Sequence, residues 1–457
     1  MFSSALTYPL RYVLSFLPTR MPPMIRRNYA WELLSALFLP AAIACIEGEV
    51  LGVIAKKTFD APDLVIAAIS ASPTLAMLTS ILWTRLIRGR DRVRLVNRLQ
   101  VIFLAHVLLL AFVPVSSAGI LGLVLLAYGG RVCLTGIITA RTDLWRANYP
   151  RHARGRVTGK LTIIVTIVIS LTSLVLASVM DTGVVGDTTG FRIVYGASSL
   201  AGLAGVWAFS RVRWRGRAAH LSAENKTERH GAVSLVGPGA MWRILRTDRR
   251  YRRFMVAQFI LGVPNLAALP IVIIGIEEHF HLGYLPTIGL TKVLPIMAMT
   301  VFIPFWAHLL DRLHIVHFRV YHAWTFVFAN VLIGLGMMMG LIELLVLGRL
   351  AIGVAHAGGV LAWNHGHHDY SSRELASVYM GIHVTLTGVR GAFAPFLGTL
   401  LYGAWAWNWP GVVSIEWGGL GAATFFVLAG VSVYGALLFL RLHRETRTKK
   451  LTPAELA

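Results

Sequence analysis

Ionisable side chains stand inside long apolar stretches of this sequence, and each has to be explained by what it pairs with or does. Even on a lenient scale, a charged side chain at the middle of a membrane-spanning helix costs about 2.5–3.5 kcal/mol. The side chains concerned are Glu47, Glu49, Arg131, Lys292, Arg349, His356, His383 and Arg390. Arginine and lysine outnumber the two glutamates, so the set favours an anionic ligand.

Two of the apolar stretches carry an arginine and a histidine at the same spacing. Arg349 and His356 are seven residues apart, which is two turns along one helix face, and His383 and Arg390 have the same separation. On antiparallel neighbouring helices, a rise of about 1.5 Å per residue places both arginines at one depth and both histidines about 10 Å deeper. This arrangement predicts a cavity that binds an anion. The alternative is that each arginine only caps backbone carbonyls and holds helices together.

The first apolar stretch holds two carboxylates that are candidates for carrying a proton. Glu47 and Glu49 are two residues apart, so they cannot share a helix face. Glu47 is the deeper, and a buried carboxyl group can exchange a proton during turnover, so it is predicted to couple proton movement, with Glu49 as second candidate. Glu49 can instead meet Lys56 or water at the outer interface. Lys292 is predicted to join the arginines in ligand binding, or to extend its ammonium group to the membrane surface.

Other motifs that suggest chemistry are better explained as loops. Residues 365–369 (HGHHD) contain good transition-metal ligands, but they fall where the first half of the chain has the loop 148–150. Residues 155–160 resemble a phosphate-binding loop with a spacing one residue too short and no Ser or Thr after the lysine. No nucleophile–base pair stands out. The sequence therefore predicts no metal site, no cofactor and no enzyme active site.

The composition indicates a membrane protein. Of 457 residues, 56% are hydrophobic and 14% charged, whereas a soluble domain has about 25% charged residues. Apolar stretches near 20 residues recur, each long enough for a hydrocarbon core of about 30 Å. Because lipid offers no hydrogen bonds to the backbone, each is predicted to be a helix. The twelve predicted spans are 30–56, 62–85, 98–115, 118–141, 159–181, 190–211, 254–277, 285–310, 319–340, 342–363, 377–403 and 418–440.

The positive charge is unevenly distributed along the chain. The net charge is +22, from 43 Lys and Arg against 21 Asp and Glu. All but seven of the basic residues lie in the N-terminal segment, the alternate connecting loops, the middle of the chain and the C-terminal segment. This is the positive-inside pattern, so both termini and the central linker are predicted to be cytoplasmic. The same pattern argues against a nucleic-acid partner, because the charge follows the membrane topology.

Landmarks in the first half of the chain recur in the second half in the same order. Proline-led segments at 73–77 and 295–299 are each followed by a tryptophan, and the Gly-Arg pairs at 130–131 and 348–349 precede a tryptophan by the same interval. Arg131 in the first half thus corresponds to Arg349 in the second half, and the two arginines are predicted to bind one ligand from opposite sides. The predicted organisation is an interfacial segment (1–29), a six-helix bundle (30–211), a basic linker (212–253), a second six-helix bundle (254–440) and a cytoplasmic tail (441–457).

The linker ends in a segment that combines arginines with apolar residues. Residues 241–254 include Trp242, Ile244, Leu245 and Tyr251 among many arginines. This pattern is typical of an amphipathic helix that lies on the inner leaflet and binds anionic lipid. The alternative is a solvated basic linker.

Two Asp-Arg pairs stand in cytoplasmic loops that correspond between the halves. Asp91-Arg92 follows the second predicted span and Asp311-Arg312 follows the eighth. The major facilitator superfamily carries Gly-x-x-x-Asp-Arg-x-Gly-Arg-Arg in the corresponding loops, and the chain resembles that family over nearly its whole length. The residues that depart from the signature at its glycines are Ile87, Ala307 and His314. The resemblance implies that both Asp-Arg pairs belong to gating loops.

The helix motifs of that family are matched in part. Arg349 and Gly353 reproduce its Arg-x-x-x-Gly in the tenth span, whereas in the fourth span the glycine after Arg131 comes one residue later, at Gly136. The predicted span 159–181 has no proline, so it lacks the glycine-proline motif of the family's drug antiporters. The resemblance implies two pseudo-symmetric bundles of six helices, without identifying a subfamily.

The function expected from these observations is secondary transport of a small solute. The resemblance implies alternating access, with an acidic residue on the first helix, here Glu47, binding a coupling proton. The excess of basic groups inside the spans favours an organic anion as substrate, and a bacterial inner membrane is the expected location. Two alternatives remain: a transporter-like scaffold or sensor, and a polytopic membrane transferase, against which the outer loops are short and lack paired carboxylates.

Overall fold

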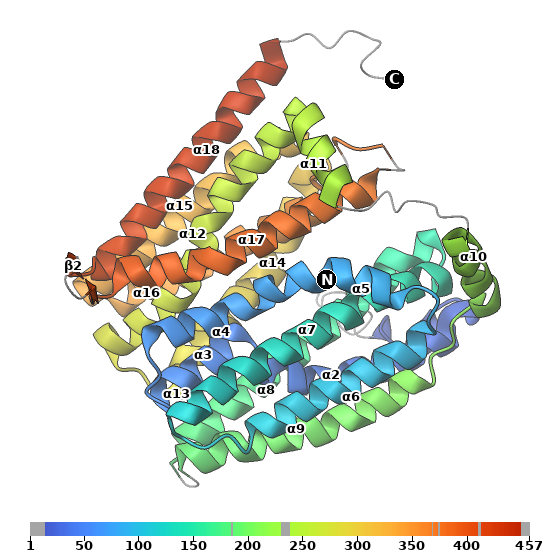
Figure 1. The fold of residues 1–457 in the computed structure, drawn as a ribbon, viewed down its shortest axis with the longest axis horizontal. Coiled ribbons are helices and arrows are strands. Elements are labelled where there is room, and N and C mark those ends of the chain that lie inside the picture. Colours follow the sequence, from blue (N-terminus) through green and yellow to red (C-terminus); the bar gives the residue numbers. More distant parts are fainter. Residues whose placement is uncertain are drawn as a thin grey trace, which may run out of the picture. The chain divides into compact units, whose positions relative to one another are not determined.

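The computed structural model describes residues 14–183, 186–229, 238–367, 369–372, 375–409 and 413–448. Within these residues, twelve helical segments are long and apolar enough to cross a membrane. The helices, drawn in Figure 1, are α2 (Pro23–Cys45), α3 (Gly48–Lys57), α4 (Asp63–Ala76), α5 (Ser80–Ile87), α6 (Arg92–Leu110), α7 (Ser117–Asn148), α8 (Arg151–Asp181), α9 (Asp187–Ser210), α10 (Arg217–Arg229), α11 (Pro238–Thr247), α12 (Arg249–Phe280), α13 (Tyr284–Ile288), α14 (Leu294–Leu310), α15 (Ile315–Met339), α16 (Ile342–His365), α17 (Ala376–Tyr402) and α18 (Thr424–Thr448). The predicted all-α fold with twelve spans is confirmed.

Three of the described spans are interrupted part-way along their length. α2 and α3 follow one another across Ile46 and Glu47, and a 3-10 turn (Met77–Thr79) joins α4 to α5. A π-helical turn (Gly289–Val293) joins α13 to α14. Such interruptions of the regular hydrogen-bond ladder occur often at functional sites, and two of the three carry charged residues singled out from the sequence.

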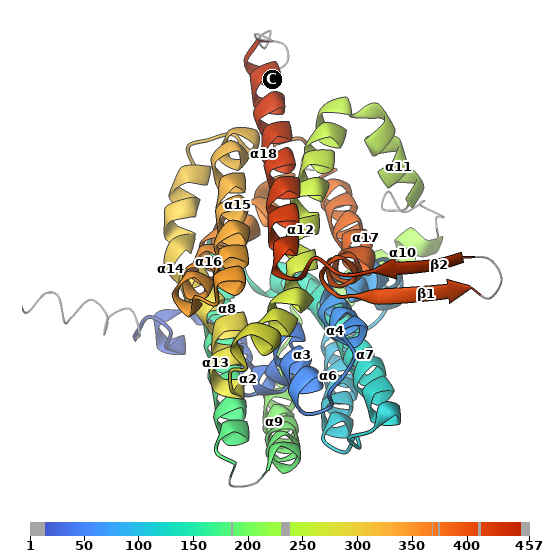
Figure 2. The same cartoon turned by 90° about the vertical axis from the view of Figure 1, so that its left-hand side faces the viewer.

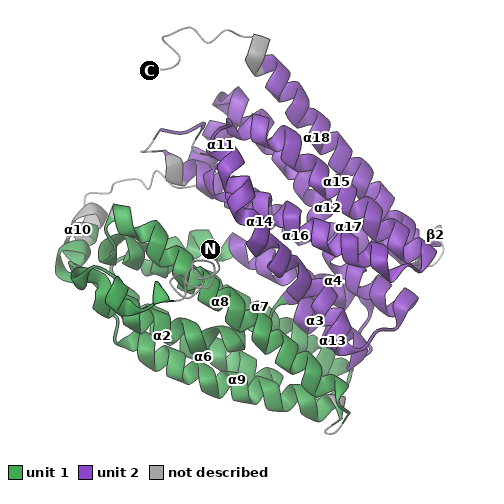
Figure 3. Cartoon of the chain, turned by 180° about the vertical axis from the view of Figure 1, so that it is seen from behind, with its two compact units in different colours: residues 1–47, 79–233 green, residues 48–78, 234–457 purple. Residues whose placement is uncertain are grey.

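The chain forms two compact units, coloured separately in Figure 3. Unit 1 comprises residues 1–47 and 79–233, and unit 2 comprises residues 48–78 and 234–457. The breaks in the first two spans are therefore the points where the chain passes from one unit to the other. The bundles 30–211 and 254–440 predicted from the sequence describe covalent halves, and α3 and α4 belong to the first half by sequence and to unit 2 by contacts.

Unit 1 is organised around α2. This helix packs on α8 and α9, while α6 packs on α7 and α9. Near its start, the Glu32 carboxylate, 1% exposed, accepts hydrogen bonds from Trp145 Nε1 (2.7 Å), Tyr149 Oη (2.7 Å) and Arg141 (3.2 Å). Burial, with the Glu32 carboxylate beside it, raises the pKa of Tyr149 well above its usual range, so this phenol stays a donor. The cluster fastens α2 to the end of α7.

The start of the linker is fixed on unit 1 by two asparagines. Asn28 Nδ2 donates to the carbonyl of Arg213 (2.9 Å), and the backbone N–H of Arg213 donates back to Asn28 Oδ1 (3.0 Å). Two residues later the N–H of Arg215 donates to Asn148 Oδ1 (3.1 Å). The chain that leaves α9 is thus held against the ends of α2 and α7.

Unit 2 is held together by close helix contacts. α12 packs on α17 and α18, α15 on α16 and α18, and α4 on α17. Glycine permits two of these contacts: a Cβ on Gly398 would lie 2.3 Å from the carbonyl oxygen of Ala267 on α12, and one on Gly391 would lie 2.0 Å from Thr74 Oγ1 on α4. Small residues at helix-packing spacing therefore bring α17 against both neighbours.

A β-hairpin connects α17 to α18. Strands β1 (Trp405–Trp409) and β2 (Val413–Trp417) pair antiparallel, with Trp405 opposite Trp417 and Trp407 opposite Ile415. Figure 2 shows the two strands side by side at the start of α18. Residues 404–417 lie between the predicted spans 377–403 and 418–440, where a connecting loop is expected, so this hairpin is an addition to the predicted architecture.

Candidate functional site

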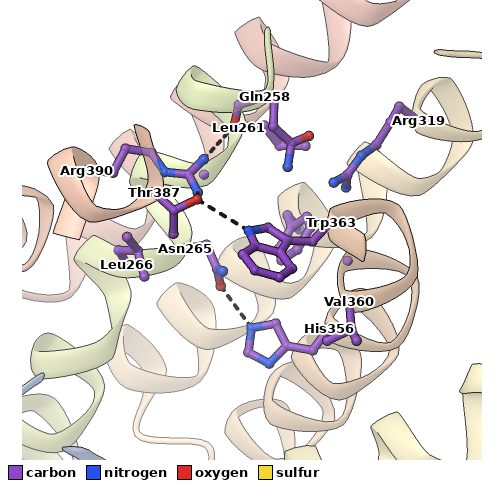
Figure 4. Close-up of a pocket in the computed structure, with 13 residues that line it drawn as sticks. Gln258, Leu261, Asn265, Leu266, Arg319, His356, Val360, Trp363, Thr387 and Arg390 are labelled. Atoms are coloured by element: carbon purple, nitrogen blue, oxygen red, sulfur yellow. Dashed lines mark hydrogen bonds between the residues drawn. The ribbon is translucent and has the colours of Figure 1, made fainter. Parts of the chain in front are cut away.

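Unit 2 contains a pocket of about 210 Å³ formed by α12, α15, α16 and α17 (Figure 4). Its polar lining residues are Gln258, Asn265, Arg319, His356, Trp363, Thr387 and Arg390. None of the described residues that line it is acidic. Two guanidinium groups without a carboxylate give the pocket a positive charge in a low-dielectric setting, where an anion is strongly attracted.

Arg390 is held at one side of the pocket by neutral acceptors. Its Nη1 donates to the carbonyl oxygen of Gln258 (2.7 Å) and its Nη2 to Thr387 Oγ1 (3.2 Å). Its Nε has no hydrogen-bond partner among the described residues. Gly262 makes room for the guanidinium, because a Cβ there would lie 1.7 Å from Arg390 Nη1. Among the described residues Arg390 therefore has no carboxylate partner, and its Nε–H group is still to be satisfied.

Arg319 enters the pocket from the opposite side in the view of Figure 4. It is 2% exposed, and its Nη1 donates to Nδ1 of His322 (2.8 Å). Arginine can only donate, so His322 Nδ1 accepts and the ring proton lies on Nε2, which donates to the carbonyl of Ala355 (2.7 Å). A neutral histidine thus orients Arg319, whose Nε has no partner among the described residues.

Uncharged polar groups complete the pocket. Asn265 Oδ1 accepts a hydrogen bond from His356 Nε2 (2.9 Å), and Trp363 Nε1 donates to Thr387 Oγ1 (3.4 Å), as Figure 4 shows. Gln258 Oε1 is buried without a partner among the described residues. The lining therefore offers donors from two arginines together with one acceptor, on a wall that also carries the Trp363 ring.

The sequence predicted four arginine and histidine side chains on α16 and α17 in one cavity, and the structure places two of them there. His356 and Arg390 line the pocket. His383 is 1% exposed, its ring centroid lies 5.4 Å from that of Trp363, and neither ring nitrogen has a hydrogen-bond partner among the described residues. His383 thus lies behind the tryptophan that forms the wall.

Arg349 contacts the backbone of the π-helical turn instead. Its Nε donates to the carbonyl of Leu290 (3.0 Å) and its Nη2 to that of Thr291 (2.7 Å). These contacts are the carbonyl-capping arrangement weighed as the alternative for the arginines. Capping satisfies acceptors at the place where the helix departs from regular geometry.

Lys292, in the same turn, forms an ion pair within the span. Its Nζ lies 3.2 Å from Glu49 Oε2, which comes from α3. Lys56, the alternative partner considered for Glu49, pairs with Asp63 at 2.7 Å. The pair links the interrupted first span to the interrupted eighth span inside unit 2.

Arg131 and Glu47 form the corresponding pair in unit 1. Arg131 Nη2 lies 3.2 Å from Glu47 Oε1 and donates to the carbonyl of Ile46 (2.7 Å). Arg131 therefore contacts the point where α2 ends and the chain leaves unit 1. In both units a basic side chain holds the break of a helix and a carboxylate lies beside it.

The first predicted gating loop contacts the linker. Asp91 caps α6 by accepting from the N–H groups of its first turn and lies 2.9 Å from Arg217 Nε. Arg92 is 3% exposed, forms an ion pair with Glu224 of α10, and lies 3.5 Å from Asp143. The Asp-Arg pair thus fixes α10 on the turn between α5 and α6.

The second predicted gating loop is arranged differently. Asp311 and Arg312 are exposed in the turn between α14 and α15. Asp369, from the predicted metal-like string, accepts a hydrogen bond from the N–H of Ile315 (2.9 Å) and lies 3.7 Å from His314. His368 of that string lies outside the described residues. Among the residues described, no three metal-ligating side chains come together.

Arg319, Gln258, Asn265, Trp363 and Thr387 are site residues that the sequence analysis missed. Arg319 is the first residue of the predicted ninth span (319–340), where a basic side chain is expected at the membrane surface, whereas α15 begins at Ile315 and buries Arg319. A signal was available, because Arg319 and His322 share a helix face next to an apolar run. The uncharged residues carried no distinguishing signal.

Comparison with solved structures shows a known fold. The chain is similar to the nucleoside transporter NupG, with 14% identity and a TM-score of 0.64 over 91% of this chain and 99% of that chain. It is similar to a D-xylose-proton symporter, with 13% identity and a TM-score of 0.68 over 92% and 98% of the two chains. It is also similar to a POT family transporter in complex with a thioalcohol-conjugated peptide, with 13% identity and a TM-score of 0.65 over 92% of this chain and 96% of that chain. No protein-family model and no curated protein sequence matches. The fold is that of the major facilitator transporters, as the resemblance predicts.

Proposed function

We propose that the protein is a secondary transporter that moves a small organic anion across a bacterial inner membrane by alternating access, with a proton as co-ion. Both termini and the linker lie in the cytoplasm. The substrate binds in the pocket of unit 2, where Arg319 and Arg390 hold its anionic group and His356 lines the cavity. The other binding residues expected from the sequence, Arg131, Arg349, His383 and Lys292, do not line this pocket.

The observation that carries the proposal is the charge of the pocket. Burying a guanidinium without a counter-ion is costly, and here Arg319 and Arg390 share a pocket with no acidic residue in its described lining. An anionic ligand supplies the missing compensation and accepts the unsatisfied Nε–H groups. The planar guanidinium groups of the two arginines approach from two sides, and each can donate a pair of hydrogen bonds to a carboxylate.

The rest of the pocket favours an organic body on that anion. Trp363 and Phe326 contribute aromatic surface, and Gln258 Oε1 is an acceptor for a donor group on the ligand. A volume of about 210 Å³ limits the ligand to a small molecule. The compared proteins are, by their descriptions, a nucleoside transporter, a D-xylose-proton symporter and a POT family transporter in complex with a conjugated peptide, so small-solute transport is the activity that this fold favours.

Proton coupling is assigned to the two carboxylates at the helix breaks. Each is paired with a basic group: Glu47 with Arg131, and Glu49 with Lys292. Protonation removes the charge of the carboxylate and releases its partner, which weakens the contact at the break. Because each break is a point where a span can bend, proton binding there can bias one conformation over another.

Proton transfer by Glu47 is tested by replacing it with a neutral isostere. Glu47→Gln is expected to abolish substrate accumulation driven by a pH gradient while sparing counterflow exchange, which needs no net proton movement. Glu49→Gln serves as the comparison. Full accumulation by the Glu47→Gln protein would assign the proton to another group.

Anionic lipid is the proposed partner of the basic linker. On α11, Met241 is buried against α17, near Gly381 and Thr385, whereas Trp242 is 68% exposed. Arg243 and Arg246 lie on the same short helix. An apolar ring beside arginines suits a membrane surface, and vesicles with and without anionic lipid would distinguish this from a solvated linker.

The proposed transport activity is tested in proteoliposomes. Purified protein would be assayed with a panel of small carboxylates, with neutral analogues of the same size as controls, with and without an imposed pH gradient. We expect saturable uptake of carboxylates only. Uptake of the neutral analogues at equal rates would contradict the anion assignment, and a lack of any uptake or binding would favour the scaffold or sensor alternative.

A further inference from the structure

The hairpin β1–β2 has two chemically different faces. Side chains alternate between faces along a strand, so the pairing places Trp405, Trp407, Ile415 and Trp417 on one face and Ala406 and Glu416 on the other. Trp407 is 61% exposed and Ile415 52% exposed. A tryptophan-rich surface is therefore uncovered within the part of the chain that the structure describes.

The hairpin is fastened to the end of α17. Trp405 Nε1 donates to the carbonyl of Leu400 (3.0 Å), and Trp417 Nε1 donates to that of Leu401 (3.4 Å). Both carbonyls belong to the last turn of the helix, where no intrahelical N–H group is available to them, and that of Leu401 also accepts from the backbone N–H of Leu420 (2.9 Å). Figure 2 shows the strands lying across the direction of α18 and extending beyond the helices to which they are joined.

This position puts the hairpin at a membrane surface. α17 and α18 are successive spans, so the segment between them emerges on the side opposite both termini. An exposed apolar stripe runs along α17 to the same end, made by Val389, Phe393, Leu397 and Leu400. The hairpin follows directly after the last turn of α17, where a membrane-spanning helix reaches the headgroup region.

We propose that the tryptophan face lies on the bilayer, in the headgroup region of the leaflet opposite the termini, as an aromatic anchor for the α17–α18 corner. Tryptophan suits this region because its ring is apolar while its N–H can hydrogen-bond. The other face carries Glu416, whose carboxylate is excluded from lipid and stays in water. The two faces together fix which side of the hairpin meets the membrane.

The bilayer is a better partner for this face than a soluble ligand. The four side chains form an apolar surface, whereas a site for a polar solute needs convergent hydrogen-bonding groups. The indole N–H groups of Trp405 and Trp417 already bind the α17 backbone. Lipid requires only apolar area and a position at the interface, and the hairpin has both.

The test places a fluorophore on adjacent residues of opposite faces. Ile415→Cys and Glu416→Cys would be made in a Cys45→Ala, Cys133→Ala background, labelled with a polarity-sensitive dye, and reconstituted in phosphatidylcholine nanodiscs. We expect spin-labelled lipid to quench the dye at 415 at least threefold more than at 416, and aqueous iodide to show the reverse order. Trp407→Cys and Ala406→Cys provide a second pair, with 407 behaving like 415.

Three outcomes would overturn the proposal. Equal iodide quenching at 415 and 416 would place both faces in water. Protection of 415 from both iodide and spin-labelled lipid would mean that protein, such as a second copy of this chain, covers the face. Preferential lipid quenching at 416 would mean that the hairpin is turned over. Size-exclusion profiles matching the unlabelled protein would show that the variants are folded.

Discussion

At the scale of single residues, the pocket in unit 2 depends on a glycine as much as on its arginines. Gly262 faces the guanidinium of Arg390 so closely that any side chain would occupy the same space. Gly359 lines the same pocket, yet a Cβ there would meet only Phe326 and His322 at 3.8 Å and 4.0 Å. The two glycines therefore make a matched pair for testing whether the position of Arg390 matters.

Gly262→Ala is expected to displace Arg390 and weaken substrate binding about tenfold, roughly 1.4 kcal/mol. Gly359→Ala, which adds the same methyl group to the same pocket, should change affinity less than twofold. The measurement is substrate affinity of the purified protein, with thermal stability as the control for folding. Equal losses in the two variants would mean that pocket volume matters and the position of Arg390 does not.

Replacing Arg349 is expected to lower stability, whereas replacing Arg390 is expected to lower substrate affinity. Removing its guanidinium leaves the Leu290 and Thr291 carbonyls without this donor, and an unsatisfied buried group costs about 1–3 kcal/mol. Arg349→Ala is therefore expected to lower the melting temperature, and Arg349→Lys to restore part of it. Arg390→Ala should lower affinity more than stability. Loss of substrate affinity in an Arg349→Ala protein of normal stability would instead support the predicted clamp between Arg131 and Arg349.

At the scale of elements, the linker helix α10 is attached to the turn before α6. Glu224 accepts from the backbone N–H of Gly89 (2.9 Å) and pairs with Arg92, while Arg217 pairs with Asp91. The Asp-Arg signature thus binds a helix that the family signature alone does not predict. The acidic partner of Arg92 is Glu224 in the linker, and no spacing of residues in the sequence predicts that these two side chains meet.

Glu224→Gln is expected to loosen α10, because the amide keeps an acceptor for Gly89 but loses the charge that pairs with Arg92. Hydrogen exchange of residues 217–229 should accelerate severalfold, while exchange in α2 stays unchanged. Glu445→Gln, which breaks an exposed pair with Arg253, is the control and should leave α10 unaffected. Unchanged exchange in α10 would show that the ion pair does not hold it.

The sequence predicts the elements that are defined by length and hydropathy, but it does not predict those that depend on local backbone geometry. All twelve spans were predicted, because each needs about 20 apolar residues. The hairpin was missed although Trp405, Trp407 and Trp409 alternate with a period of two. The π-helical turn at 289–293 has no hydropathy signal, and the burial of Arg319 depended on one turn of helix at a boundary.

At the scale of the whole molecule, the charge distribution predicts which side of the membrane each loop occupies. Ala218 in α10 and Ala118 at the start of α7 are both exposed and lie in regions predicted to be on opposite sides. Both native cysteines are buried, so an introduced cysteine would dominate labelling. The two positions form a matched pair for the topology.

Ala118→Cys is expected to react with a membrane-impermeant thiol reagent in intact cells, and Ala218→Cys only after the cells are opened. The physical reason is the retention of arginine-rich segments on the cytoplasmic side. Labelling would be measured by a mass shift of the purified protein. The reverse order would overturn the orientation without affecting the fold.

The linker is attached to unit 1 at one end and to unit 2 at the other, so the length of the chain between these attachments limits the separation of its two ends. Up to the end of α10 the linker belongs to unit 1, where Asn28, Asn148 and the Asp-Arg turn hold it, and from α11 onward it belongs to unit 2. Only residues 230–237 lie between the two helices. At no more than about 3.3–3.6 Å per residue, that stretch spans about 30 Å. The end of α10 and the start of α11 therefore cannot lie further apart than that length, so the covalent chain limits how far these two helix ends can separate in any conformation of the protein.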